Sequence, residues 1–83
     1  MNPRELLRRL YRRNTSNVKF GEFQQLVEAF GFSLRRIRGS HHLFKHPKVP
    51  GFLNLQPKKG EVATYQVRQF LKLIEKYDLH LED

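Results

Sequence analysis

Three of the four histidines in this 83-residue chain lie within six positions, in the segment RGSHHLFKHP at 38–47. They directly follow a Gly-Ser pair, which is typical of a tight two-residue turn between two strands. An imidazole ionises near neutral pH, so it can transfer a proton, bind a metal ion or form ordinary polar surface. The side chains that surround each imidazole distinguish these three uses.

A metal site is the use that the sequence supports least. Neighbouring side chains of a strand point to opposite faces, so His41 and His42 are poorly placed to share one ion. In a regular strand His41 and Leu43 share one face, whereas His42, Phe44 and His46 share the other. None of the eight acidic residues lies beside the cluster, and the chain has no cysteine. We therefore expect no metal site and no cofactor.

Proton transfer requires fewer protein groups than a metal site does. For RNA cleavage a single base can suffice, because RNA carries its own nucleophile. A base that takes the proton of a 2′-hydroxyl lets that oxygen attack the adjacent phosphorus, which leaves a 2′,3′-cyclic phosphate and a 5′-hydroxyl. Cationic side chains stabilise the charge that develops on the phosphate. Arg36, Arg38 and Lys45 lie close enough in sequence to do so. A histidine on a half-exposed strand is also common as plain surface, so these residues alone leave both interpretations open.

The composition favours a polyanionic partner. Sixteen Lys and Arg residues against eight Asp and Glu residues give a net charge of +8. This charge suits nucleic acid first and an acidic protein second. No apolar run approaches the ~20 residues that cross a bilayer, and the N-terminus lacks the apolar segment of a secretory signal. We expect a cytoplasmic protein without membrane association, and the absence of cysteine excludes disulfides and thiol catalysis.

Apolar residues at three- and four-residue steps predict three helices. The first begins at Asn2, a good N-cap, and ends near Arg13. The second covers about twelve residues from Phe20 and ends at Gly31, where glycine can adopt a left-handed conformation. The third follows Thr64, which we expect to cap it.

The first helix carries a basic face whose role the sequence does not decide. Its arginines, which could grip phosphates or simply face water, are Arg8, Arg9, Arg12 and Arg13. We expect this helix to pack on the core through an apolar stripe that contains Leu6, Leu7 and Leu10.

Between the second and third helices the sequence predicts strands at 33–38, 41–45 and 52–55, then a basic loop at 56–63. Residues 78–83 read as a short acidic tail that could be frayed. The element order predicts an α+β fold in one domain, 1–83, with a three-stranded antiparallel sheet and helices on one face. Residues 1–15 form an N-terminal extension of a core at 18–77.

Several motifs together resemble HicA-type toxins. The motifs are Phe-Gly-Glu-Phe leading into Glu-Ala-Phe-Gly-Phe, Arg-x-x-Gly-Ser-His-His-x-Phe-x-His-Pro at 36–47, Leu-Asn-Leu-Gln-Pro, and Tyr-Gln-Val-Arg-Gln at 65–69. The resemblance runs from about Val18 to Tyr77. It implies a fold like that of a double-stranded-RNA-binding domain, α-β-β-β-α, here preceded by an extra helix. It also implies the toxin of a type II toxin–antitoxin system, a metal-independent endoribonuclease that cleaves mRNA.

The resemblance places the essential histidine directly after the Gly-Ser turn, at His41. Some similar sequences carry it one place later, which would match His42, and we favour His41 because it follows the turn immediately. We expect RNA contacts from Arg36, Arg38, Ser40, Lys45, Lys58 and Lys59. The segment 61–63 lacks a lysine expected in similar sequences, so phosphate contacts near it would depend on the two lysines just before it.

The resemblance further implies a HicB-like antitoxin that binds the toxin and covers its active site, so we expect a monomer or a hetero-oligomer with that antitoxin. An acidic antitoxin would suit the net charge of +8. A non-catalytic RNA-binding module with the same basic fold is the main alternative, and a basic structural subunit of an assembly is another.

Overall fold

The computed structural model describes residues 1–82, which form three helices and six strands. The helices are α1 (Pro3–Tyr11), α2 (Phe20–Ala29) and α3 (Thr64–Lys76). The larger antiparallel sheet has the order β2–β3–β4, with β2 at Ser33–Arg38, β3 at His41–Lys45 and β4 at Leu53–Leu55. The smaller has the order β1–β6–β5, with β1 at Val18–Lys19, β5 at Pro57–Lys58 and β6 at Glu61–Val62.

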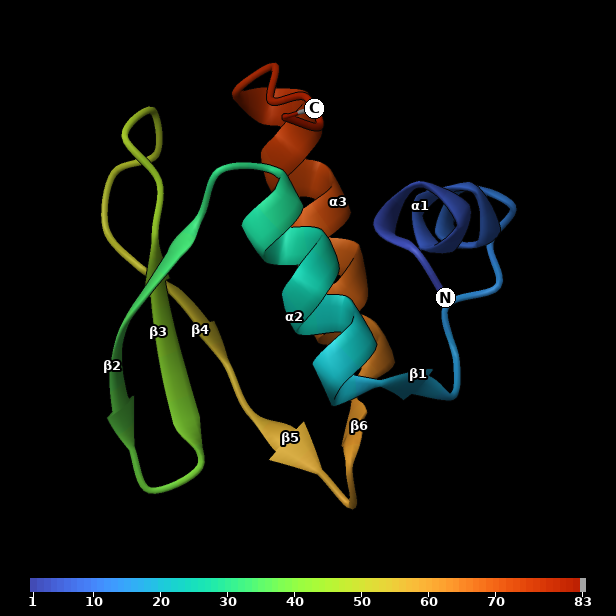
Figure 1. Cartoon of the computed structure of the whole chain (residues 1–83), viewed down its shortest axis with the longest axis horizontal. Helices are drawn as coiled ribbons and strands as arrows, with labels where there is room; N and C mark the ends of the chain where they lie inside the picture. Colours follow the sequence, from blue (N-terminus) through green and yellow to red (C-terminus); the bar gives the residue numbers. More distant parts are fainter. Residues whose placement is uncertain (83) are drawn as a thin grey trace.

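This arrangement confirms the predicted α+β class. The elements α2, β2, β3, β4 and α3 follow one another in the α-β-β-β-α order of a double-stranded-RNA-binding-like fold. Figure 1 shows α2 and α3 side by side on one side of the β2–β3–β4 sheet. Both sheets are antiparallel and every helix presents an apolar stripe, so the elements pack around a shared core.

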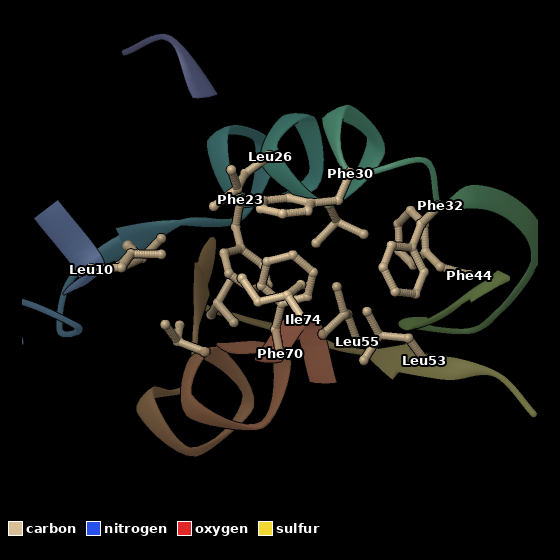
Figure 2. Packing of buried hydrophobic residues seen from close by; sticks show 14 of the residues in the cluster. Leu10, Phe23, Leu26, Phe30, Phe32, Phe44, Leu53, Leu55, Phe70 and Ile74 are labelled. Carbon is tan, nitrogen blue, oxygen red and sulfur yellow. The ribbon is translucent and has the colours of Figure 1, made fainter. Parts of the chain in front are cut away.

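Phe70 of α3 lies at the centre of this core. Its ring meets those of Phe23, Phe30 and Phe32 at centroid distances of 5.3, 5.5 and 5.9 Å, each in an edge-on geometry (Figure 2). Edge-to-face aromatic pairs contribute about 0.5–1.5 kcal/mol each beyond the area that they bury. Phe70 therefore ties α2 and the start of β2 to α3.

The N-terminal helix is part of the same core, as expected. Leu6 and Leu10 are buried in the hydrophobic cluster, and Leu7 packs against it. The helix lies on the other side of α2 and α3 from the larger sheet (Figure 1). Its apolar stripe covers helix surface that would otherwise meet water.

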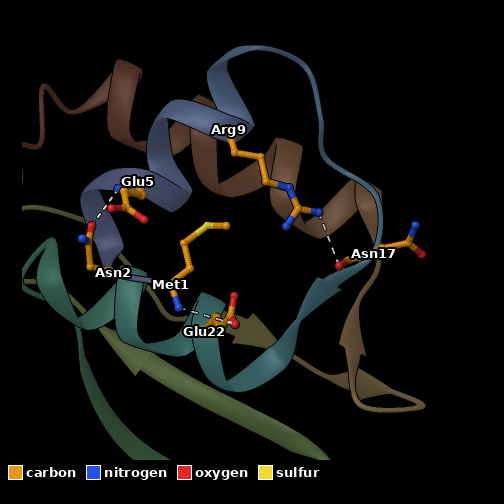
Figure 3. Close-up of polar contacts among 6 residues, drawn as sticks. All are labelled: Met1, Asn2, Glu5, Arg9, Asn17 and Glu22. Atoms are coloured by element: carbon orange, nitrogen blue, oxygen red, sulfur yellow. Dashed lines mark hydrogen bonds and ion pairs between the residues drawn. The ribbon is translucent and has the colours of Figure 1, made fainter.

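Polar contacts fasten both ends of α1 (Figure 3). The side chain of Asn2 accepts a hydrogen bond from the Glu5 backbone N–H at 2.9 Å, which confirms it as the N-cap. The Met1 amino group lies 3.7 Å from the Glu22 carboxylate of α2. At the other end the guanidinium of Arg9 donates to the backbone carbonyl of Ser16 at 2.6 Å. Arg9 thus has a structural role and is not part of a free basic face.

Several predicted boundaries were wrong. The first helix ends at Tyr11 and not near Arg13. Thr64 is the first residue of α3 and not its cap, because Ala63 occupies the cap position without a side-chain hydrogen bond. The Thr64 hydroxyl donates instead to the Thr15 carbonyl at 3.4 Å.

Two segments that the sequence predicted to lack regular structure are ordered by contacts with distant parts of the chain. The 56–63 loop contains β5 and β6, and β6 pairs with β1 through Val18 opposite Val62. In the C-terminal segment Leu79 is buried, and the Glu82 backbone N–H donates to the Ala29 carbonyl at 2.8 Å. The described part of this tail, up to residue 82, is therefore packed and not frayed, whereas Asp83 lies outside the described residues.

Tyr11 marks the contact between the end of α1 and α3. Partial burial raises the pKa of its phenol, and the nearby Glu75 carboxylate raises it further. No helix within residues 1–82 combines the length and the apolar character needed to cross a membrane.

We predict that Leu10→Ala destabilises the protein by about 2–4 kcal/mol, because it removes a fully buried side chain and leaves a cavity. Urea denaturation followed by circular dichroism measures this change. Arg12→Ala, at the exposed C-cap of the same helix, is the matched control and should stay within about 0.5 kcal/mol. A loss below about 1 kcal/mol for Leu10→Ala would show that α1 is not part of the cooperative core.

Candidate active site on the β2–β3 hairpin

The histidine segment lies on a hairpin whose register is fixed at both ends. Gly39 supplies the positive φ of the turn, 57°, and Arg38 lies directly opposite His41. Ser33 is opposite Lys45 at the far end, with an irregularity in β2 between Leu34 and Arg36. Directly opposed residues of an antiparallel pair point to the same face, so the register decides which side chains meet.

The two faces of the larger sheet differ sharply. Phe44 is fully buried toward the helices, and Leu53 and Leu55 are buried on the same face. We call this the inner face. Residues that alternate with them form the outer face, turned away from α2 and α3, which carries Arg36, Arg38, His41, Leu43 and Asn54.

His41 is exposed on the outer face, beside the turn. Its Nδ1 lies 3.2 Å from Oδ1 of Asn54 in β4. An amide oxygen can only accept, so this contact requires the proton on Nδ1, and in the neutral imidazole the lone pair is then on Nε2. The result is an oriented, solvent-accessible imidazole with a free basic nitrogen and Arg38 directly across the strand pair.

His42 points to the inner face and is half-buried. Its ring lies 4.8 Å from that of Phe20 at the start of α2, tilted by 59°. Its Nδ1 donates to the Ser40 carbonyl at 3.0 Å. His42 thus packs between the sheet and α2 while it braces the turn from within.

His46 is buried and structural. Its Nε2 donates to the Phe30 carbonyl at the end of α2, at 3.0 Å, and its Nδ1 accepts the Lys48 backbone N–H, also at 3.0 Å. Its ring packs on Phe32 at 5.0 Å. Gly31 has a φ of 98°, and an added Cβ there would approach the His46 ring within 3.0 Å. The third histidine therefore joins the end of α2 to the turn after β3.

The six expected RNA-contact residues fall into three groups. Arg36, Arg38 and Ser40 are exposed on or beside the outer face near His41. Lys58 and Lys59 are exposed on the β5–β6 hairpin, and Figure 1 shows this hairpin and the β2–β3 turn at the same end of the molecule. The structure thus brings five of the six to one end of the fold.

Lys45 stands apart from the other five. Its ammonium donates to the Val49 carbonyl at 2.6 Å and to the Gly51 carbonyl at 2.9 Å. It also lies 6.0 Å from the centre of the exposed Phe52 ring. These contacts hold the loop between β3 and β4 and occupy two of the three ammonium donors.

Asn54 is the site residue that sequence reasoning missed. It lies thirteen positions after His41, and only the pairing of β3 with β4 brings the two side chains together. The available signal was its place in Leu-Asn-Leu, where a polar residue between two buried leucines must face the opposite side of a strand from them. Among residues 1–82 no three His, Asp or Glu side chains cluster in a way that could hold a metal ion.

A model of the family described as HicA toxin of bacterial toxin–antitoxin systems matches residues 20–75. The match covers more than half of the 83 residues and includes α2, the larger sheet and most of α3. The chain belongs to the HicA toxin family. No curated protein and no solved structure gave a significant match.

Family membership confirms the resemblance seen in the sequence and identifies the protein as a toxin of a toxin–antitoxin system. The matched part of this HicA toxin holds the Gly39-Ser40 turn and all three clustered histidines. Helix α1 precedes the match, so it is an addition to the part that the family model describes.

We predict that His46→Ala costs about 2–4 kcal/mol of stability, because it leaves a buried carbonyl and a backbone N–H without partners and opens a cavity beside Phe32. Thermal and urea unfolding measure this loss. The exposed His80 is the matched control, and its alanine variant should stay within about 0.5 kcal/mol. Equal stability of the two variants would contradict the structural role of His46.

Proposed function

We propose that this HicA toxin is an endoribonuclease that cleaves mRNA without a metal ion, and that His41 is its general base. The observation that carries the proposal is the state of His41: exposed, tied through Nδ1 to Asn54, and directly opposite Arg38. In the neutral imidazole this arrangement leaves the lone pair of Nε2 open to a substrate, with Arg38 directly across the strand pair.

The reaction follows from the chemistry of RNA. Nε2 of His41 takes the proton of a ribose 2′-hydroxyl, and the 2′-oxygen attacks the adjacent phosphorus. The bond from phosphorus to the 5′-oxygen breaks, and that oxygen leaves with a proton from water or from the imidazolium. The products are a 2′,3′-cyclic phosphate and a 5′-hydroxyl, and no step requires a metal ion.

Arg36 and Arg38 are the proposed partners for the phosphate oxygens, since they share the outer face with His41. Guanidinium groups suit this task because they form paired hydrogen bonds with phosphate. We place Lys58 and Lys59 on the flanking RNA backbone, and the Ser40 hydroxyl beside the turn that the RNA approaches. We leave Lys45 out of this group because its ammonium already binds two backbone carbonyls.

His42 is a weaker candidate for the base than His41. Its ring packs on Phe20, and the residues opposite it in the two neighbouring strands are Ile37 and Leu55. A ribose-phosphate strand would have to enter between the sheet and α2 to reach it. We infer that His42 supports the turn and that His41 carries the chemistry.

We also propose that a HicB-type antitoxin binds this toxin and blocks the outer face. The support is family membership together with a face that carries Arg36 and Arg38 and has no acidic residue among its members. An acidic antitoxin surface would complement this face and exclude RNA from it.

We predict that purified wild-type toxin cleaves mRNA in excess EDTA and that His41→Ala lowers the rate by about 10²–10⁴-fold. Gel analysis measures cleavage, and mass spectrometry should find the cyclic phosphate. His42→Ala is the matched control, because it removes the neighbouring imidazole and should retain most of the rate per folded molecule. Expression without an antitoxin should arrest bacterial growth for wild type and not for His41→Ala.

Other outcomes would change the assignment. Loss of cleavage in His42→Ala alone, with the fold intact, would move the base to His42. Salt-sensitive RNA binding without cleavage by any form would identify a non-catalytic RNA-binding module instead. Cleavage that stops with EDTA would exclude the metal-free mechanism.

We predict a smaller loss for Asn54→Ala, about 2–12-fold in cleavage rate, because one orienting hydrogen bond is worth about 0.5–1.5 kcal/mol. Single-turnover kinetics at saturating toxin measures this effect apart from RNA binding. Gln25→Ala, at an exposed position of α2, is the control and should leave the rate unchanged. An unchanged rate for Asn54→Ala would show that Asn54 does not orient the base.

A further inference from the structure

A second basic surface lies on α3, away from the histidines. The exposed side of this helix forms a shallow open groove lined by Tyr65, Arg68, Gln69, Lys72, Leu73 and Lys76. The buried residues of the helix, among them Val67 and Phe70, lie on the opposite side. The groove therefore faces outward from the helix layer, whereas His41 faces outward from the sheet.

The cations of this groove are spaced by single helical turns. Arg68, Lys72 and Lys76 follow one another at four-residue steps, so their stems are about 6 Å apart along the axis. Arg13, at the end of α1, lines a neighbouring hollow together with Arg68 and extends the row. We call these four residues the α3 cation row.

The α3 cation row carries more positive than negative charge within residues 1–82. None of its four residues forms an ion pair in the described part of the chain. Glu75, the acidic residue of α3, is exposed one turn from Lys72 and forms no ion pair with the row among the described residues. The row therefore carries four positive charges beside a single carboxylate of the same helix.

The groove is also apolar along its floor. Tyr65 is 68% exposed, the largest exposure among the big hydrophobic side chains of the described residues, and Leu73 lines the same groove. Exposed apolar surface bordered by charge is typical of a protein-binding site. Leu73 is half-buried and packs partly on the core, so Tyr65 is the exposed apolar group of the groove.

We propose that the α3 cation row binds a protein partner through an acidic amphipathic helix. Glutamates spaced by one turn on that helix would meet the cations, and its apolar residues would pack on Tyr65 and Leu73. The contact lies on a different face from His41, so it can tether a partner without closing the active site. This inference is independent of the proposed catalysis.

The backbone at Arg13 agrees with a binding role for its side chain. Arg13 adopts a left-handed conformation, with φ 66°, directly after the C-cap of α1. Glycine adopts this conformation with less strain than any residue that carries a Cβ. Arginine at this position therefore adds a charge to the row where glycine would suit the turn better.

The test uses two fluorescent probes at ~0.15 M salt, where exposed charges are screened beyond about 8 Å. One is a helical peptide with glutamates at every fourth position beside a leucine stripe. A peptide of the same composition with scattered leucines is its control. The other is an oligouridine with 2′-O-methyl riboses, which keeps the phosphates and resists cleavage. We expect the striped peptide to bind the full-length toxin at least about tenfold tighter than the scattered one, without displacement by the RNA.

The triple variant Arg68→Gln, Lys72→Gln, Lys76→Gln, which lowers the net charge from +8 to +5, should weaken peptide binding at least about tenfold and change RNA binding by less than about threefold. Arg13→Gly should weaken peptide binding while the melting temperature stays equal or rises, which separates binding from folding. Equal binding of both peptides, or none, would overturn the proposal. Displacement of the peptide by RNA, or loss of RNA binding in the triple variant, would identify an RNA-binding tract instead. Loss of His41-dependent cleavage would affect the proposed function and leave this inference standing.

Discussion

The burial of Phe44 decides what β3 can do. A strand has a period of two, so the face that Phe44 takes fixes the face of every other side chain in the strand. Phe44 lies in the core with no exposed surface, which directs His42 inward and His41 outward. A slip of one residue would move His41 against the helices and expose Phe44. The apolar core thus positions the imidazole as firmly as any polar contact around it.

The three clustered histidines show why composition could not assign their roles. His42 has a local partner, the Ser40 carbonyl two residues away. The partners of His41 and His46 lie thirteen and sixteen positions away, in β4 and at the end of α2. Sequence alternation correctly separated His41 from His42, because that property is local. Which imidazole is buried, braced or free depends on strand pairing and on the packing of α2, and the sequence alone does not show these.

The same division between local and distant signals explains the errors in the predicted fold. The three helices, the Gly39 turn and the larger sheet carry strong periodicity or special residues, and the structure confirms them. Strands β1, β5 and β6 have two residues each, which is too short for any alternation to be visible. Thr64 has the residue type of a cap, yet its hydroxyl bonds to the carbonyl of Thr15, forty-nine positions away. Asn54 became part of the site only through its neighbours across the sheet.

The fold also shows where on the surface the excess positive charge lies, which the net charge of +8 alone does not. Two acidic groups lie in ion-pair contacts, Glu22 with the N-terminus and Asp78 with His80, and Glu61 is opposite Lys19 in the register of β1 and β6. Two groups of cations without an ion pair then lie on the outer face of the sheet and in the α3 cation row. The first surface holds an oriented base and no large apolar side chain beyond the half-buried Leu43, which suits a phosphate chain. The second holds an exposed tyrosine and no imidazole, which suits a protein. The excess positive charge can thus bind two different partners, because the core separates the outer face of the sheet from the α3 cation row.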